Sequence, residues 1–487
     1  MSKLYIEICN IVGRFSNYIA EHKFIFCSLL VAFLACSFQF WIAYPGWINW
    51  DTIALTIIKD TNLEPVSITY VFLGLFKLFG RHVWLILLVS VIPFYLGLFV
   101  LSLAFYRRYN SFWALLLFFP MFIQNIFVSN FILLSTSMLA NFSFLLFAII
   151  LYYVLNPSKH KNILLFSLAV IMYILSLFVR HNGIIQVCFA PLIIIYLYLK
   201  NLNLTKKQFL LRYLFLILCS AIISVCIVVV PSKILPIREE MSPSFHILAN
   251  ELAAMCVPAD DSACFEEKWY VKGKNWQDLK FIFNSNPTNA NILAFHRGRS
   301  QVINSDIIEP NEMKEKFLYA VKKYPLNLVQ HEVRLLSTIC TEPMYYFAER
   351  APYWDGKSPF YITFNFYTKF DISSLKIFPA DELYLHETPL KLKLLHVWDD
   401  YMPKTPTMFW VILLTIYSIF SFLLFKKMQK ENIFVYNFLL SLGGIFAVII
   451  YGGFYPEPVY RYMHPIWVYG VLVTIAYVAI LIDRVKK

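Results

Sequence analysis

Residues 24–64 read FIFCSLLVAFLACSFQFWIAYPGWINWDTIALTIIKDTNLE, and this stretch decides the fold class. Its first part, residues 24–44, has no charged side chain, and as a helix it is long enough to cross a hydrocarbon core about 30 Å thick. Similar apolar runs recur along most of the 487-residue chain, which is 59% hydrophobic and only 15% charged. The sequence therefore predicts an all-α polytopic membrane protein.

The second part of the stretch places acidic residues beside tryptophans, directly after the first apolar run. If Asn49 caps a short helix, Asp51 lies in its first turn, where the helix dipole keeps the carboxylate ionised. Trp50, Ile53 and Ile57 share one face, which predicts a helix lying on the bilayer surface. An ionised carboxylate there suits a general base acting between a lipid-borne substrate and a soluble or polymeric one. The alternative interpretation is a carboxylate that only stabilises its helix.

Charge distribution predicts how the chain crosses the membrane. Residues 65–79 are apolar but would extend only about 22 Å as a helix, so we expect a second juxtamembrane helix started by Pro65. All short basic loops then fall on one side of the membrane, together with both termini. The expected crossings are 24–44, 83–105, two within 112–155 (with an outer bend marked by Pro120, Gln124, Asn125 and Asn130), 163–180, 184–199, 214–231, 408–425, 433–453 and 466–483.

This topology gives about ten transmembrane helices in two modules. Residues 1–231 form the first module, with an external loop at 45–82, and residues 406–487 form the second. Between them, residues 232–405 are large enough for an external domain. We expect this domain to be mainly helical, with helices at 245–256, 311–323 and 326–340.

The net charge of +12 does not indicate a nucleic-acid partner, because the basic residues occur in small groups between apolar runs. Such groups are typical of the short loops whose Lys and Arg residues set the orientation of a membrane protein. The partners implied by composition are membrane lipids.

Two of the nine cysteines, Cys256 and Cys264, fall in the external stretch CVPADDSAC. A disulfide closing this loop would contribute about 2.5 kcal/mol in the chain-entropy model. Cys340 is also external and could compete for the pairing. Since no histidine pair accompanies the two cysteines, their spacing argues against zinc. The acidic residues of this region are expected to be only solvated; they are Asp260, Asp261, Glu266 and Glu267.

Three arginines are expected on the outer face, where positive charge is normally depleted: Arg81, Arg180 and Arg461. For Arg180, which precedes His181, and for Arg461, we favour an anionic partner such as a lipid phosphate, which a guanidinium binds through paired donors. The alternatives are snorkelling to headgroups or a salt bridge to Glu457 or Glu64. Arg81 and His181 are further candidates for phosphate binding, although the sequence does not favour phosphate at Arg81.

Three short motifs carry a family resemblance: NWDT (49–52), VRHNG (179–183) and YRYMHP (460–465). With the span count, the acidic first loop and the long external domain, they resemble the GT-C superfamily of polyprenyl-phosphate-sugar-dependent glycosyltransferases. The closest likeness is to bacterial and phage-encoded O-antigen glucosyltransferases that cause serotype conversion.

The resemblance implies a GT-C-like bundle in which Asp51 is the catalytic base and Arg180 and Arg461 hold the carrier phosphate. Many members carry a second acidic residue beside the first or a later His-Pro, whereas this chain has Glu64-Pro65. Glu64 therefore remains open as a partner carboxylate, a metal ligand or the base itself.

The resemblance also implies a reaction and a place. The reaction is inverting transfer of a sugar, glucose in the similar enzymes, from undecaprenyl phosphate to a lipid-linked O-antigen of lipopolysaccharide or a similar polysaccharide. The site would face the periplasm from a bacterial inner membrane; no cofactor is implied, and metal dependence stays open. One alternative is a related transferase acting on lipid A, another glycan carrier or a protein. Another is a lipid-linked-sugar flippase or other transporter, but we find no broken helices or repeated halves in the sequence.

Overall fold

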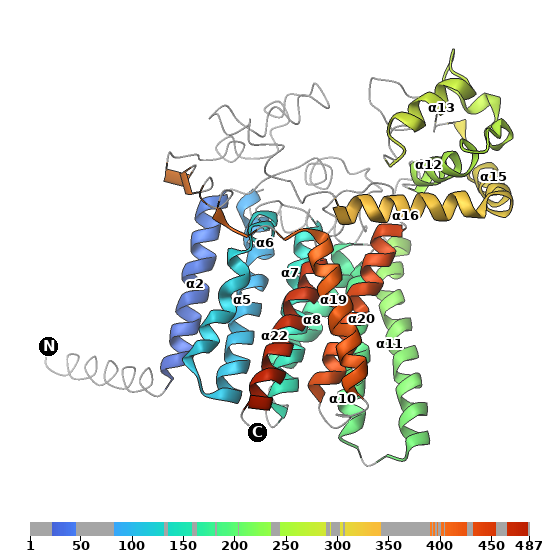
Figure 1. Cartoon of the computed structure of the whole chain (residues 1–487). Coiled ribbons are helices and arrows are strands. Elements are labelled where there is room, and N and C mark those ends of the chain that lie inside the picture. The colour runs from blue at the N-terminus through green and yellow to red at the C-terminus, as the bar shows by residue number, and fades with distance from the viewer. Residues whose placement is uncertain are drawn as a thin grey trace, which may run out of the picture.

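The computed structural model describes residues 22–44, 82–130, 135–157, 163–180, 183–202, 204–234, 244–288, 293, 302–304, 307–341, 390–391, 393–394, 397, 401–403, 405–425, 432–453 and 465–485. Within these ranges the chain is helical, and its only β-type contact is an isolated antiparallel bridge between Tyr270 and Ile303. Figure 1 shows a bundle of roughly parallel and antiparallel helices with a smaller helical part, the outer domain, at one end. The predicted all-helical fold is confirmed for these residues.

The bundle helices follow the apolar runs of the sequence. They are α2 (Lys23–Ala43), α5 (Val83–Tyr109), η1 (Phe112–Phe122), α6 (Gln124–Ser129), α7 (Ser135–Leu155), α8 (Ile163–Val179), α9 (Gly183–Val187), α10 (Phe189–Lys200), α11 (Lys206–Ile234), α19 (Thr407–Phe425), α20 (Asn432–Gly453) and α22 (Ile466–Val485). Seven helices, with α9 and α10 taken as one, are long and apolar enough to cross a membrane. The shorter η1, α8 and α19 are apolar as well. This is the architecture of a multi-pass membrane protein.

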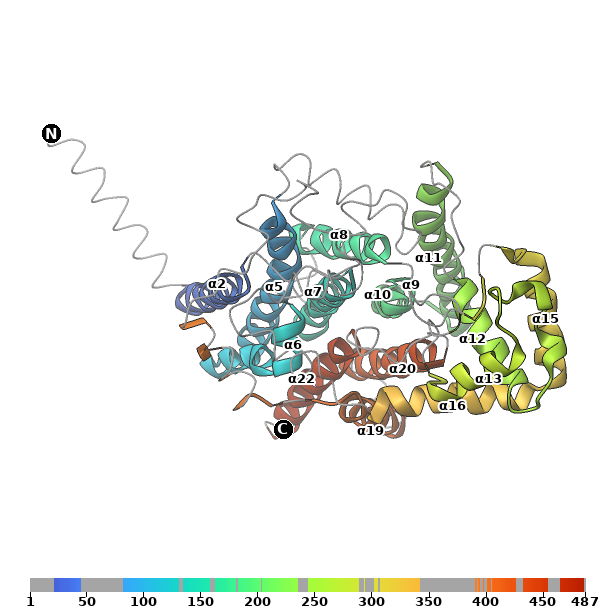
Figure 2. The same ribbon diagram turned by 90° about the horizontal axis from the view of Figure 1, so that it is seen from above.

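Helix α7 forms the centre of the bundle, and α11 lies at its periphery (Figure 2). Between residues 136 and 155, every side chain except Tyr153 is buried, and α7 contacts α5, α8, α20 and α22. In α11, by contrast, Ser224 is the one buried residue among 206–230, and its hydroxyl pairs with the hydroxyl of Tyr173 on α8 at 2.7 Å. Many of the apolar side chains of α11 are exposed, including Leu214, Phe215 and Ile222, as expected for a helix in contact with lipid, while Ile227 and Val228 pack against the bundle core.

Basic residues occur in the last turns of α5, α10 and α22. Figure 1 shows that α22 ends at the C-terminal end of the bundle, away from the outer domain. Arg107 and Arg108 occupy the last turn of α5, where they stabilise the negative end of the helix dipole. Arg108 also forms a 2.6 Å ion pair with Asp483 of α22. Asn110 then ends α5 in the left-handed conformation, at φ 50°. The topology expected from the sequence depends on this clustering of basic residues at one end of the bundle.

The segment 112–155 doubles back as expected, but its first limb is not a continuous α-helix. It consists of the 3₁₀ helix η1 followed by the short helix α6. Pro120 lies inside η1 and not at the outer bend, and the reversal falls between α6 and α7. Pro120 has no N–H for a regular helical bond. The limb is interrupted at Ile123, whose N–H bonds the Pro120 carbonyl at 3.1 Å.

The outer domain contains the helices predicted for it. Its elements are α12 (Ser244–Cys256), η3 (Ser262–Cys264), η4 (Glu267–Trp269), α13 (Trp276–Ser285), α15 (Pro310–Lys323) and α16 (Pro325–Thr341). They enclose a separate apolar core that includes Met255, Trp269 and Phe283. Helix α16 connects this core to the bundle, because it contacts α12 and α15 as well as α19 and α20.

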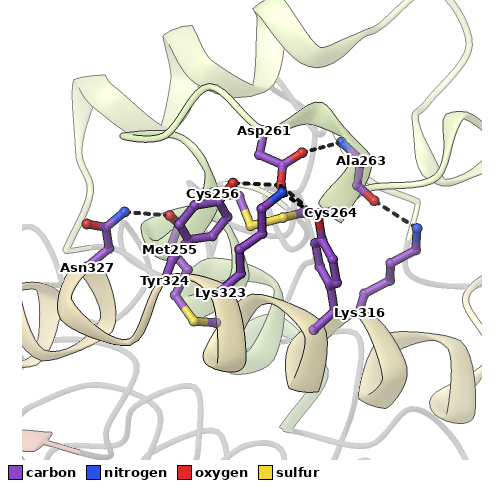
Figure 3. Close-up of a disulfide and its surroundings, with 10 residues drawn as sticks. Met255, Cys256, Asp261, Ala263, Cys264, Lys316, Lys323, Tyr324 and Asn327 are labelled. Carbon is purple, nitrogen blue, oxygen red and sulfur yellow. Dashed lines mark hydrogen bonds and ion pairs between the residues drawn. A yellow bond between two sulfur atoms is a disulfide. The ribbon is translucent and has the colours of Figure 1, made fainter.

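A disulfide joins Cys256 and Cys264, the pairing that the sequence favours (Figure 3). Cys340 is buried as a free thiol. The loop closed by the disulfide is also held by Asp261, which accepts hydrogen bonds from Lys323 Nζ at 3.0 Å and from the Tyr324 hydroxyl at 2.8 Å. Burial raises the pKa of Asp261, but these hydrogen bonds outweigh it and lower the pKa below its ordinary value.

The prediction that the acidic loop is only solvated is therefore wrong for three of its four carboxylates. Asp261 is paired as above, Asp260 forms an ion pair with Lys280 at 2.7 Å, and Glu266 forms one with Lys316 at 2.6 Å. Lysines that lie next to these acids only in the folded chain supply the partners.

Two carboxylates are largely withdrawn from water in α12 and α16. Burial raises the pKa of Glu251 to about 7, and burial together with the charge of Glu251 raises the pKa of Glu332 to about 8. Both pKa values exceed the ordinary glutamate value of 4.5, so the folded chain favours the protonated carboxyl. The stability that these two groups contribute is fully present below pH 4.5 and is lost as the pH rises through their folded pKa values. Burial lowers the pKa of the neighbouring His331 to about 4. Above its ordinary pKa of 6.5 this imidazole is neutral in the folded and the unfolded chain, so it adds no pH dependence to stability there.

We therefore expect Glu332→Gln to remove part of the pH dependence of stability. Between pH 6.5 and about 8, the thermal midpoint of the wild-type chain in nanodiscs falls because unfolding releases the proton of Glu332, while that of the variant falls less. Glu315→Gln, on the exposed face of α15, is the matched control and should follow the wild-type curve. Parallel curves for the wild type and Glu332→Gln would contradict the burial argument.

Candidate functional site

The segments that carry the predicted site residues all join the bundle at the end that faces the outer domain. At this end α2 and α8 finish, α5 and α9 start, α20 finishes and α22 starts (Figure 1). The residues on the connecting segments lie outside the described residues; they are Asp51, Glu64, Arg81, His181 and Arg461. Arg180 is the predicted site residue that the structure places.

Arg180 directly follows α8 and is buried, with 8% of its surface exposed. Its Nη1 donates a hydrogen bond to Thr136 Oγ1, at the start of α7. A snorkelling arginine would extend to the surface, so burial argues against that interpretation for Arg180. Its charge is kept inside the end of the bundle, where water screens it least.

The turn after Arg180 requires glycine. The N–H of Gly183 bonds the carbonyl of Arg180 at 2.9 Å, so the chain reverses tightly between α8 and α9. A Cβ on Gly183 would lie 2.0 Å from the carbonyl oxygen of Ser176. No larger residue fits this approach, and the glycine of VRHNG thereby fixes the position of Arg180 relative to α9.

A buried amide network lies about two turns into α5 and α7 from the same end and includes Asn130, which follows α6. Asn141 Nδ2 donates to the Ser90 carbonyl and to Asn130 Oδ1, both at 2.8 Å. Within the described part of the chain, Asn130 Nδ2 and Ser90 Oγ have no hydrogen-bond partner although both are buried. Unsatisfied buried polar atoms are uncommon and need an explanation such as water or a ligand.

Gln186 brings together two of the three motifs. Its Nε2 donates to the carbonyl of Pro465, the last residue of YRYMHP, at 3.1 Å, and to Ser143 Oγ at 3.3 Å. Its own carbonyl accepts from the Tyr469 hydroxyl at 2.5 Å. The start of α9, which follows VRHNG, is thus tied to the start of α22, which follows YRYMHP.

Lys391 is a cation that the sequence analysis did not single out. It is buried, and its Nζ lies 5.3 Å from the ring centroid of Trp41, in the last turn of α2. Burial lowers the pKa of Lys391. An attraction between the ammonium and the indole holds the lysine beside the end of α2. No motif or spacing marks Lys391; only its place in a segment that the sequence predicts to be external was a signal.

This end of the bundle combines charged and neutral hydrogen-bond donors in a mostly apolar setting. Such donors bind an anion more strongly than they would in water. The described residues contain no group of three or more His, Cys, Asp or Glu side chains that could hold a metal ion. Charged and amide donors in such a setting can hold a phosphate or another oxyanion.

Comparison with known proteins gives no relative. No family model matches the chain, and neither a curated protein nor a solved structure is significantly similar to it. Function is therefore inferred from the geometry around Arg180 and from the chemistry of the segments joined at that end.

Proposed function

We propose that this chain is an inverting membrane glycosyltransferase. Its donor is undecaprenyl phosphate carrying a sugar, glucose by the resemblance, and its acceptor is a lipid-linked O-antigen or a similar polysaccharide. The observation that carries the proposal is the burial of Arg180 at the bundle end where the segments bearing Asp51, Glu64 and Arg461 leave and re-enter. A guanidinium held there is suited to a lipid-borne phosphate.

The proposed reaction is a single displacement. Asp51 takes the proton of an acceptor hydroxyl while the oxygen attacks C1 of the sugar, and the bond between C1 and the phosphate oxygen breaks. Negative charge develops on the departing undecaprenyl phosphate, where Arg180 and Arg461 stabilise it. Glu64 is the alternative base, and His181 and Arg81 are further contacts for the phosphate.

The proposed orientation places the outer domain in the periplasm and both chain ends in the cytoplasm. Counting η1 with α6, α8 and α19 as crossings brings the total to ten. The support is the grouping of Arg107, Arg108, Lys200 and Arg484 at the opposite end, since cytoplasmic ends carry an excess of Lys and Arg.

A transporter of lipid-linked sugars is the second candidate, and one observation favours it. Two crossing limbs are interrupted, at Ile123 between η1 and α6 and at Cys188 between α9 and α10, and interrupted helices are typical of transporters. Arg180, however, directly follows α8 at the end of the bundle, whereas transporter sites lie near the midplane. A transferase acting on lipid A, another glycan carrier or a protein would use the same chemistry.

Reconstitution tests the proposal. Purified protein is placed in liposomes with undecaprenyl phosphate carrying radiolabelled glucose and with a lipid-linked O-antigen acceptor. We expect label on the acceptor and free undecaprenyl phosphate by mass spectrometry, and no transfer when a nucleotide sugar replaces the lipid donor. If the label stays on undecaprenyl phosphate but changes leaflet, the transporter is correct and the transferase is wrong.

A further inference from the structure

Helix α16 lies across the end of the bundle and not along it. In Figure 1 the crossing helices run vertically while α16 is horizontal at their outer end, and Figure 2 shows it passing α19 and α20 and continuing beyond the edge of the bundle. Its C-terminal half contacts the bundle: Leu336 packs against the bundle core, and Cys340 is buried. On another face, Leu328 packs against the core of the outer domain.

The face of α16 that meets the bundle continues past it as an exposed apolar row. Residues 326, 329, 333, 336 and 340 follow one another at spacings of three and four, so they share one stripe of the helix. Leu336 and Cys340 of this stripe are covered, but Leu326, Val329 and Val333 are 73%, 56% and 60% exposed. The neighbouring exposed positions on the other side are polar, at Gln330, Arg334 and Ser337.

The direction of the stripe identifies what covers its exposed half. Because Leu336 points toward the bundle, the side chains one and two turns earlier on the same stripe point toward the same level, beside the ends of the crossing helices. Beyond the bundle edge, that level is the boundary between headgroups and acyl chains. Apolar side chains backed by a polar face with an arginine are typical of a helix that lies in this boundary.

We propose that the apolar row of Leu326, Val329 and Val333 inserts into the lipid bilayer and seats the outer domain on the membrane surface. This inference depends on the bundle crossing a membrane and not on the transferase reaction. The row would lie about 5–10 Å into the boundary between headgroups and acyl chains. The outer domain is then held at two places: by the contact of α16 with α19 and α20, and by lipid.

Depth-dependent quenching tests the proposal. In the full-length chain, with the free cysteines replaced and the Cys256–Cys264 disulfide kept, single cysteines at Val329 or Val333 are labelled with bimane and the protein is placed in nanodiscs of phosphatidylethanolamine and phosphatidylglycerol. Gln330→Cys and Ser337→Cys are the matched controls on the polar side. We expect severalfold stronger quenching at Val329 and Val333 when a nitroxide is carried at the top of the acyl chain, and stronger quenching of the controls by a water-soluble quencher.

Two outcomes would overturn the proposal. Equal access of the water-soluble quencher to Val329 and Gln330 would mean that the row faces water. Protection of Val329 from both quenchers, together with a doubled protein mass in the nanodisc, would mean that a second copy of the chain covers it. Since the labelled positions are exposed, folding is unaffected by the label, and intact folding is verified by resistance of the disulfide to mild reduction.

Discussion

Asp51→Asn lowers sugar transfer by about 10²–10⁴-fold if Asp51 is the general base. Asparagine keeps the size of the side chain and most of its hydrogen bonds but cannot accept the proton of the acceptor hydroxyl. The variant should therefore be produced at the wild-type level and still bind the lipid-linked donor. Donor binding and transfer are measured separately with purified protein, by retention of labelled donor lipid and by label on the acceptor.

Two variants in the same loop serve as controls, Glu64→Gln and Asp60→Asn. Loss at Asp51 alone supports the assignment, whereas loss at both Asp51 and Glu64 indicates a coupled pair or a metal site. If only Glu64→Gln is inactive, Glu64 is the base. Near wild-type transfer by Asp51→Asn would reduce Asp51 to a carboxylate that stabilises its helix.

Arg180→Lys is expected to lower transfer more than tenfold, a cost of about 1.4 kcal/mol or more in transition-state stabilisation. Lysine keeps the positive charge but loses the planar set of donors, one of which is already used by Thr136. The loss should appear with the lipid-linked donor while production and thermal stability stay close to wild type. Kinetics at several donor concentrations separate weaker donor binding from slower transfer.

Arg334→Lys is the matched control, because Arg334 is exposed on α16, outside the proposed site. It should transfer sugar at the wild-type rate. Equal activity of Arg180→Lys and Arg334→Lys would show that Arg180 contributes only general electrostatics, and the phosphate assignment would be wrong.

Much of the fold could be predicted because charge and periodicity are local properties. The run at 24–44 lacks charge and forms α2, and apolar residues at helical spacing predict α15 and α16. The crossing predicted at 214–231 leaves Lys206, Lys207 and Arg212 before the helix, whereas α11 already begins at Lys206. A helix continues past the membrane boundary with its lysines in water, so charge marks the edge of the bilayer and not the end of the helix.

The candidate site was harder to predict because its contacts join distant segments. Arg180 is identifiable from sequence, since an arginine at the end of an apolar helix that is predicted to be outer is unusual. The partnership of Asn141 with Ser90 spans 51 positions, and that of Lys391 with Trp41 crosses most of the chain. Neither pair has a sequence spacing that indicates contact. The first contact exists only because α5 packs against α7, and the second only because Lys391 lies against α2.

The bond between Gln186 and Pro465 has a consequence for biosynthesis. The two residues are 279 positions apart, and Pro465 immediately precedes the last helix of the chain. While the ribosome is still making the outer domain, the side-chain amide of Gln186 lacks this acceptor, although it can already donate to Ser143 Oγ, which precedes it in the chain. The region around Arg180 therefore reaches its final form only after α22 has been inserted. A partly synthesised chain would occupy the membrane without a finished site.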